Sequence, residues 1–356
     1  MKFNDISNSI CIKQKKSKEI KGPLYFYLLK TIENKSRYKI ILLALAYTAA
    51  ASFIVEPIAS NWGADYAMYL HEFEINYFIE RFNVFLNSNN TWEFIEHFQL
   101  ITFFIIPYGL SFLGLDASES IFLISFTSAF IISYYVIQNS KDRLFLLFLF
   151  APILLDLLFF QIRSGLALAV FSAGVLVGRE YRKLSYLFFI ISILLHYSLA
   201  LLFIIYFISV KFRQSGATFE DIYTSIFINK FIGIIFSALF VILTIYYYRD
   251  YVREHIFYDS SVFGLLFFLG LMLFYILNGK NFLKDFQFQY LLSIVLLFLY
   301  PAFPQTMRVF ALSFPFHVVA LSNAPLQNKY IIFIGLMIFL LFNISNWHPL
   351  AVFFLN

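Results

Sequence analysis

The residues best suited to chemistry in this sequence are a few acids, arginines and histidines that stand beside long apolar runs. Asp65 follows the first such run, with Tyr66 next to it and Tyr69 four residues on. On a helix, Asp65 and Tyr69 would share a face with Glu72. A carboxylate beside an aromatic ring suits a sugar, because the acid takes a hydroxyl proton while the ring packs on the apolar sugar face. The alternative is a helix-terminal acid beside an interfacial aromatic belt.

Arginines form the second group of candidates. Arg163 and Arg308 each open an apolar run, and Arg249 stands four residues before Arg253. A guanidinium group binds two phosphate oxygens at once, and a pair at i, i+4 on one helix face suits a diphosphate. Structural roles are the alternative. Asp156 would share the face of Arg163 on a continuous helix and act as its counter-charge. Snorkelling to the headgroups would account for Arg308, and a self-neutralising patch in an aromatic belt for Arg249 and Arg253.

His196 is the third candidate, and it stands near the middle of the apolar run 184–210, just before Tyr197 and Ser198. A histidine inside a membrane segment needs hydrogen bonds, so it could shuttle a proton, donate to a phosphate or link two helices. His317 lies half a turn out of phase with Arg308 on a helix, which makes it a weaker candidate. The sequence has no Walker A loop, zinc-spaced His/Cys set, DxD-type acidic pair or GxSxG motif. We therefore expect no metal ion and no cofactor.

The elements that position these residues are predicted to be transmembrane helices. Charged residues make up 13% of the chain, against about 25% in soluble domains. Apolar runs stand at 40–57, 98–115, 119–138, 144–161, 164–178, 184–210, 231–248, 261–277, 288–304, 308–322 and 330–346. A bilayer core of about 30 Å is crossed by about 20 helical residues. The predicted fold is therefore all-α, a polytopic membrane bundle of about ten transmembrane segments with one or two re-entrant or broken helices.

Basic residues set the predicted orientation and the division of the chain. Residues 1–39 hold ten Lys or Arg and form a basic cytoplasmic tail, with a short patch at 24–29 lying in the interface. The loop 58–97 holds one base against six acids, so it is placed at the outer face. Residues 40–350 make a single transmembrane domain. No cleavable signal peptide is expected, and the single Cys11 excludes an internal disulfide.

Simple alternation of the apolar runs leaves two basic loops on the outer side. Two runs are candidates for re-entry: 98–115 is interrupted by Pro107, and 184–210 is overlong and carries His196. If both re-enter, five of the 26 basic residues remain outside, all of them arginines: Arg81, Arg163, Arg249, Arg253 and Arg308. A single tilted helix at 184–210 is the alternative.

In order and spacing, these residues resemble the EpsG/Wzy-type family of membrane polysaccharide polymerases over residues 40–322. The shared motifs are G-x-D-Y-x-x-Y at 63–69, I-R-x-x-L-A at 162–167, H-Y-S-x-A-L at 196–201, and Arg308 with aromatic residues after it. The chain departs from the family pattern twice. It has no arginine shortly before the first motif, and serine follows the arginine of the second motif where the family often has glutamine.

The resemblance implies a metal-independent glycosyltransferase in the bacterial inner membrane, with its N-terminus cytoplasmic. At the outer face it would join oligosaccharide units carried on undecaprenyl diphosphate into O-antigen, capsule or exopolysaccharide. Its partners would be that lipid-linked oligosaccharide, membrane lipid, a chain-length regulator and a flippase, and no nucleic acid. The implied site has a catalytic set and a substrate- or diphosphate-binding set, namely Asp65, His196 and Arg163, and Arg308, Arg249, Arg253, Tyr66 and Tyr69.

Within this scheme either Asp65 or His196 would remove the acceptor proton. Three other functions fit a chain of this composition. A flippase or other transporter of lipid-linked oligosaccharide would spread polar residues through many spans and show internal symmetry, which is not evident here. A polysaccharide-modifying membrane acyltransferase would show a buried histidine paired with an acid or arginine near a cytoplasmic entrance. A non-catalytic scaffold of an assembly complex is the third.

Overall fold

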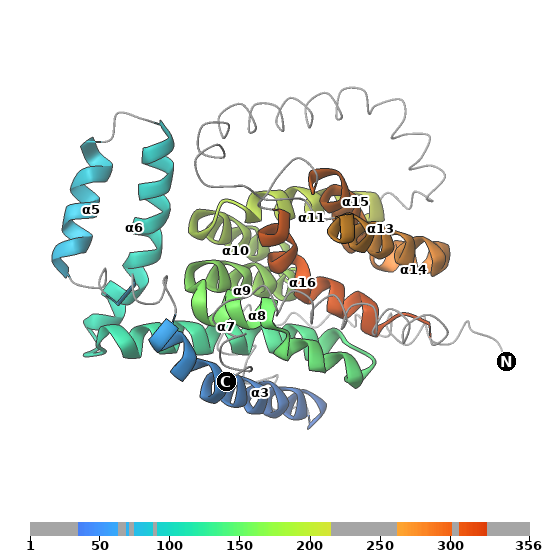
Figure 1. Cartoon of the computed structure of the whole chain (residues 1–356), viewed down its shortest axis with the longest axis horizontal. Coiled ribbons are helices and arrows are strands. Elements are labelled where there is room, and N and C mark those ends of the chain that lie inside the picture. The colour runs from blue at the N-terminus through green and yellow to red at the C-terminus, as the bar shows by residue number, and fades with distance from the viewer. Residues whose placement is uncertain are drawn as a thin grey trace, which may run out of the picture. The chain divides into compact units, whose positions relative to one another are not determined.

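The computed structural model describes residues 35–62, 69–70, 75–87, 91–214, 262–300 and 306–325. This part of the chain is helical and contains no strand, which confirms the predicted all-α class (Figure 1). The chain divides into two units, residues 1–42 and residues 43–356. Every contact discussed below lies within the second unit.

The helices are, in chain order, α3 (Lys35–Trp62), α5 (Ile75–Asn87), α6 (Thr91–Ser111), α7 (Ala117–Asn139), the 3₁₀ helix η1 (Arg143–Phe150), α8 (Pro152–Leu155), the π-helix η2 (Asp156–Phe160), α9 (Ile162–Val177), α10 (Arg182–Leu195), α11 (Leu199–Gln214), α13 (Val262–Leu277), α14 (Gly279–Asp285), α15 (Gln287–Leu299) and α16 (Thr306–Ser322). The segment 58–97, predicted as a loop, contains the end of α3, all of α5 and the start of α6. The segment between the predicted spans is thus largely helical where it is described, and its placement at the outer face stays a prediction.

Helix α9 is central to the packing of the second unit, where it pairs most extensively with α7 and α10. The ring of Phe171 on α9 is fully buried. Its centroid lies 4.9 Å from that of Phe189 on α10, 6.1 Å from that of Tyr206 on α11 and 5.7 Å from that of Phe316 on α16. Gly174 lets α9 and α10 approach closely, because a Cβ there would lie 2.9 Å from the ring of Phe189. One aromatic cluster thus fixes α9 against three other helices.

Fewer of the described helices qualify as membrane spans than the sequence predicts. By length and composition, one of them, Ala117–Asn139, could cross a membrane, or two if the bent pair Arg143–Phe150 and Pro152–Phe160 counts as a single span. Shorter apolar helical stretches of the described residues, such as Ile162–Val177 and Gln287–Leu299, have 10–17 residues, less than the ~20 needed for a bilayer core. The described part therefore does not yield about ten spanning helices, and the runs 231–248 and 330–346 lie outside it.

Two of the predicted runs are divided by helix breaks in the structure. The sequence predicts a break near His196, and α10 ends at Leu195 while α11 begins at Leu199. The break predicted at Pro107 is wrong, since α6 continues through that proline to Ser111. The run 144–161, predicted as a continuous span, instead bends by 56° between Phe150 and Pro152. Pro152 has no N–H to donate to the preceding turn, so it begins a new helix there.

Candidate functional site

Three of the residues predicted to form a site interact electrostatically. Arg163 stands in the first turn of α9, His196 directly follows the last residue of α10, and Arg308 stands in the first turn of α16. The positive charges of both arginines act on the imidazole of His196. Because only residues 178–181 connect α9 to α10, the two helices are antiparallel neighbours, and the end of α10 returns to the start of α9. Figure 1 shows this pair side by side.

The two arginines stand at helix ends that already carry a positive partial charge. A helix N-terminus exposes unpaired N–H groups and favours anions, whereas cations stabilise C-termini. Arg163 and Arg308 each add a full positive charge to such an N-terminus. This arrangement destabilises the free protein and suits the binding of an anion, because phosphate groups bind to helix N-termini and to guanidinium groups.

Arg163 also lacks part of the hydrogen bonding that a buried cation requires. Its side chain is half-buried, and its Nη1 atom is buried without a hydrogen-bond partner in the described part of the chain. An unpaired buried donor costs ~1–3 kcal/mol, and a charged donor costs more. A bound anion would satisfy that donor. Arg308, by contrast, is exposed.

Helix α9 does not continue back to Asp156, so the continuous helix that would align Asp156 with Arg163 is absent. The π-helix η2 ends at Phe160, the next residue Gln161 has a non-helical φ of −99° and ψ of 58°, and α9 begins after it. Asp156 and Arg163 therefore do not share a face of one helix. The Nε2 of Gln161 instead donates to Oδ2 of Asp156 at 2.5 Å.

The backbone turn at the end of α10 fixes the imidazole of His196. His196 is extended, with φ −154° and ψ 111°, and its N–H donates to the carbonyl of Ser192. The N–H of Ser198 donates to Nδ1 at 3.4 Å, and the ring stacks on Tyr197 with centroids 5.5 Å apart. Because Nδ1 is an acceptor, the neutral ring carries its proton on Nε2. His196 is 6% exposed, so a ligand that it meets is largely shielded from water.

Tyr69 has a packing role in the structure. It is 3% exposed, and its ring centroid lies 5.2 Å from that of Phe103 and 6.4 Å from that of Phe104, both on α6. These contacts are aromatic packing between Tyr69 and α6. The remaining predicted site residues lie outside the described residues: Asp65, Tyr66, Arg249 and Arg253.

His317, a weaker candidate by its helical phase, is buried in the structure. It is 1% exposed on α16, and its Nδ1 lies 2.8 Å from the hydroxyl of Tyr275 on α13. Its Nε2 is buried and has no hydrogen-bond partner among the described residues. The signal available in the sequence was an ionisable residue inside an apolar run, which is rare in membrane proteins and is a functional candidate by default.

A second polar cluster joins the C-terminal ends of α7, α9 and α16. The Nη2 of Arg179 donates to Oδ1 of Asn139, and the Nδ2 of Asn323 donates to the carbonyl of Asn139 at 2.8 Å. The Nδ2 of Asn139 in turn donates to the carbonyl of Tyr135 at 2.6 Å. Since α9 has 16 residues, this cluster lies about 24 Å along the helix from Arg163.

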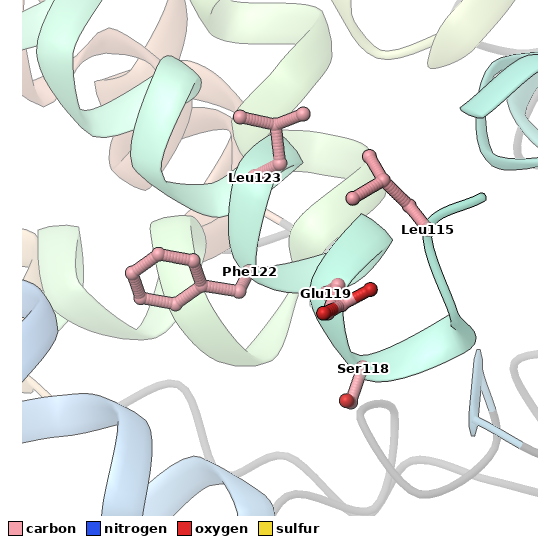
Figure 2. Close-up of a pocket in the computed structure, with 5 residues that line it drawn as sticks. All are labelled: Leu115, Ser118, Glu119, Phe122 and Leu123. Carbon is pink, nitrogen blue, oxygen red and sulfur yellow. The ribbon is translucent and has the colours of Figure 1, made fainter. Parts of the chain in front are cut away.

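A pocket of about 340 Å³ lies at the start of α7 and is separate from the arginine site. Figure 2 shows that it is lined by Leu115, Ser118, Glu119, Phe122 and Leu123. Its acid is engaged in a helix cap, because the N–H of Asp116 donates to Glu119 and the N–H of Glu119 donates back to Asp116. None of the predicted site residues lines it.

No family model, curated protein or solved structure matches this chain. In the described part, no three His, Cys, Asp or Glu residues are grouped so that they could hold a metal ion. The function must therefore be argued from the arginines, the imidazole and their surroundings.

Proposed function

We propose that this protein is a membrane glycosyltransferase that polymerises oligosaccharide units carried on undecaprenyl diphosphate, at the outer face of the bacterial inner membrane. The observation that carries the proposal is that Arg163 and Arg308, from two helix N-termini, both act on His196. That combination suits a ligand with two phosphate groups next to a reacting sugar. The motif resemblance supplies the substrate class.

The membrane location is part of the proposal, as is the bundle of about ten transmembrane segments with a cytoplasmic N-terminus. It is supported by large apolar side chains that are exposed on several helices and turns. Those more than 70% exposed are Phe53, Phe112, Leu113, Leu277 and Phe298. Lipid tails would cover such side chains, and short helices that break inside the bilayer are tolerated where other helices surround them.

In the proposed reaction, the growing chain is the donor and its lipid diphosphate is the leaving group. The acceptor hydroxyl attacks the anomeric carbon, and the bond from that carbon to the diphosphate oxygen breaks. Arg163 and Arg308 stabilise the negative charge that develops on the diphosphate. Arg249 and Arg253 would add to this stabilisation. No metal ion is needed in this scheme, because the arginines supply the positive charge.

The acceptor proton goes to a carboxylate in this scheme. Because Nδ1 of His196 accepts the N–H of Ser198, the neutral imidazole presents a donor, Nε2–H, rather than a free base. We therefore assign His196 as a donor to a phosphate or sugar oxygen, and Asp65 as the base. Tyr66 would flank the sugar near Asp65.

The test is complementation of a strain that lacks the gene, with chain length read by gel electrophoresis of the polysaccharide. Arg163→Ala should leave single-unit product on the cell surface at normal protein level. Arg143→Ala is the matched control, because Arg143 is an exposed arginine in η1, and it should keep the wild-type ladder. A normal ladder from Arg163→Ala would contradict the assignment. Units trapped at the cytoplasmic face would favour a flippase instead.

A further inference from the structure

We propose that Asp156 and Gln161 form a clamp that positions Arg163, and that Asp156 is not the counter-charge of Arg163. The importance of Arg163 rests on the function proposed above, whereas the clamp itself is argued from the geometry of η2 and α9. Asp156 and Gln161 are positioning residues in this account, since they act through the arginine.

Two hydrogen bonds, one from the backbone and one from the side chain of Gln161, close the turn between Asp156 and Gln161. The backbone N–H of Gln161 donates to the carbonyl of Asp156 at 2.9 Å, which makes the five-residue π-turn. The side-chain Nε2 of Gln161 donates to Oδ2 of the same residue at 2.5 Å. Gln161 also opens the next helix, because its carbonyl accepts the N–H of Gly165 at 3.0 Å. Arg163 stands within that first turn, so its backbone direction depends on Gln161.

A close contact fixes the first turn of α9 from a second side. A Cβ on Gly165 would lie 2.5 Å from the carbonyl oxygen of Leu157 and 3.1 Å from the Cα of Leu158. The backbone of η2 therefore lies directly against α9, and only glycine fits there. π-turns are rare and occur often at functional sites. Here the turn holds in place a cation whose Nη1 is buried and unpartnered in the described part of the chain.

The two possible roles of Asp156, as part of a clamp or as a counter-charge, require different properties of its side chain. A clamp needs an oxygen that accepts the hydrogen bond from Gln161, whereas a counter-charge needs a negative charge. The donor in this contact is a neutral amide, so the hydrogen bond between the two side chains depends on the acceptor oxygen of Asp156. Asn keeps the acceptor oxygen and removes the charge, and Ala removes both. The two substitutions therefore separate the two roles.

Polymerisation by the purified full chain is the first readout. Asp156→Asn should stay within about twofold of wild type, and Asp156→Ala should lose about tenfold to a hundredfold, because small displacements of a catalytic group are costly. Gln161→Ala removes the other half of the clamp and should match Asp156→Ala. Equal losses from Asn and Ala would show a counter-charge and overturn the clamp, as would full activity in both Ala variants.

Hydrogen exchange of the peptide covering residues 156–165 is a readout that needs no activity. Asp156→Ala and Gln161→Ala should each speed exchange of the amides of Gln161 and Gly165, and Asp156→Asn should not. This pattern supports the clamp even if Arg163→Ala leaves polymerisation intact, a result that would count against the proposed function alone. Unchanged exchange in both Ala variants, or equal acceleration in all three variants, would overturn the clamp.

Discussion

Arg163 and Arg179 stand at opposite ends of the same helix and differ in what surrounds them. Arg179 follows the C-terminus of α9, where its guanidinium donates to Asn139. Arg163 stands at the N-terminus of α9, where its Nη1 is buried and unpartnered within the described residues. A cation is stabilised by a helix C-terminus and destabilised by an N-terminus. Arg179 therefore has a structural explanation in the folded chain, whereas we propose that Arg163 binds a ligand.

The same contrast separates the two polar clusters as a whole. Around Asn139, side-chain amides satisfy backbone carbonyls of two helices, so the cluster links helix ends without any ligand. Around His196, two positive charges act on one imidazole. Such a concentration of like charge is stable only with an anion or with water nearby. We infer that the first cluster contributes stability and the second contributes binding.

The largest effect is expected from the buried arginine. In purified protein, Arg163→Ala should slow polymerisation by about 10²–10³, the usual loss when one preorganised donor to a transition state is removed. Arg308→Ala should cost less, about tenfold, because Arg308 is exposed and acts through water. Initial rates at saturating donor provide the comparison. A larger loss for Arg308→Ala would reverse the assigned roles.

Substitutions in the polar cluster around Asn139 should lower the stability of the protein rather than its reaction rate. Asn323→Ala removes the bond from Asn323 to the carbonyl of Asn139 and should lower the free energy of unfolding by about 1 kcal/mol. Asn278→Ala is the matched control. Asn278 also donates to the carbonyl four residues earlier, and its Oδ1 is buried without a partner in the described part of the chain, so its loss should cost less. Denaturation in detergent measures both. A slower reaction with unchanged stability in Asn323→Ala would contradict this division.

A smaller effect should distinguish a donor from a base at His196. Gln places an amide N–H near the position of imidazole Nε2, so His196→Gln should retain part of the activity. Asn places its amide near Nδ1 and should retain less. The rates of the two variants at equal protein level make the comparison. More activity in His196→Asn than in His196→Gln would show that Nδ1, and not Nε2, is the working atom.

The smallest effect is expected at the N-terminus of α7, which carries an acidic side chain instead of an arginine. Asp116 caps α7, and the backbone N–H of Glu119, followed by the hydroxyl of Ser118, holds the pKa of its exposed carboxyl below the ordinary 3.8. A depressed folded-state pKa adds stability above the unfolded value, and this is lost as the pH falls through the folded value. Wild type should therefore exceed Asp116→Asn in melting temperature above pH 3.8. The difference should vanish in stronger acid, and a difference that grows there would contradict the cap.

The sequence was enough to predict the helical class and the break at His196, because apolar periodicity and an overlong run are local signals. It did not predict the bend near Pro152 or the continuity of α6 through Pro107, since the effect of a proline depends on how neighbouring helices satisfy the freed carbonyl. The π-turn at Asp156 and the close approach of Leu157 to Gly165 were not predicted either, because no sequence pattern in this chain indicates them.

The arginines could be selected from the sequence because charge inside an apolar run is rare. The surroundings of each arginine could not be predicted from the sequence. The difference between Arg163 and Arg179 depends on Asn139, 40 residues from Arg179 in the chain. The partner of His317, Tyr275, lies 42 residues away on another helix, so the sequence could not indicate this contact. Long-range partners of this kind decide whether a polar residue is structural or functional.

The most direct test of this account is the affinity of the purified full chain for undecaprenyl diphosphate, measured for wild type, Arg163→Ala and Arg179→Ala. We predict that wild type and Arg179→Ala bind alike, and that Arg163→Ala binds at least about tenfold more weakly, as expected for the loss of a charge-assisted hydrogen bond. Equal affinity in all three proteins, or equal weakening in both variants, would contradict a diphosphate site at the start of α9.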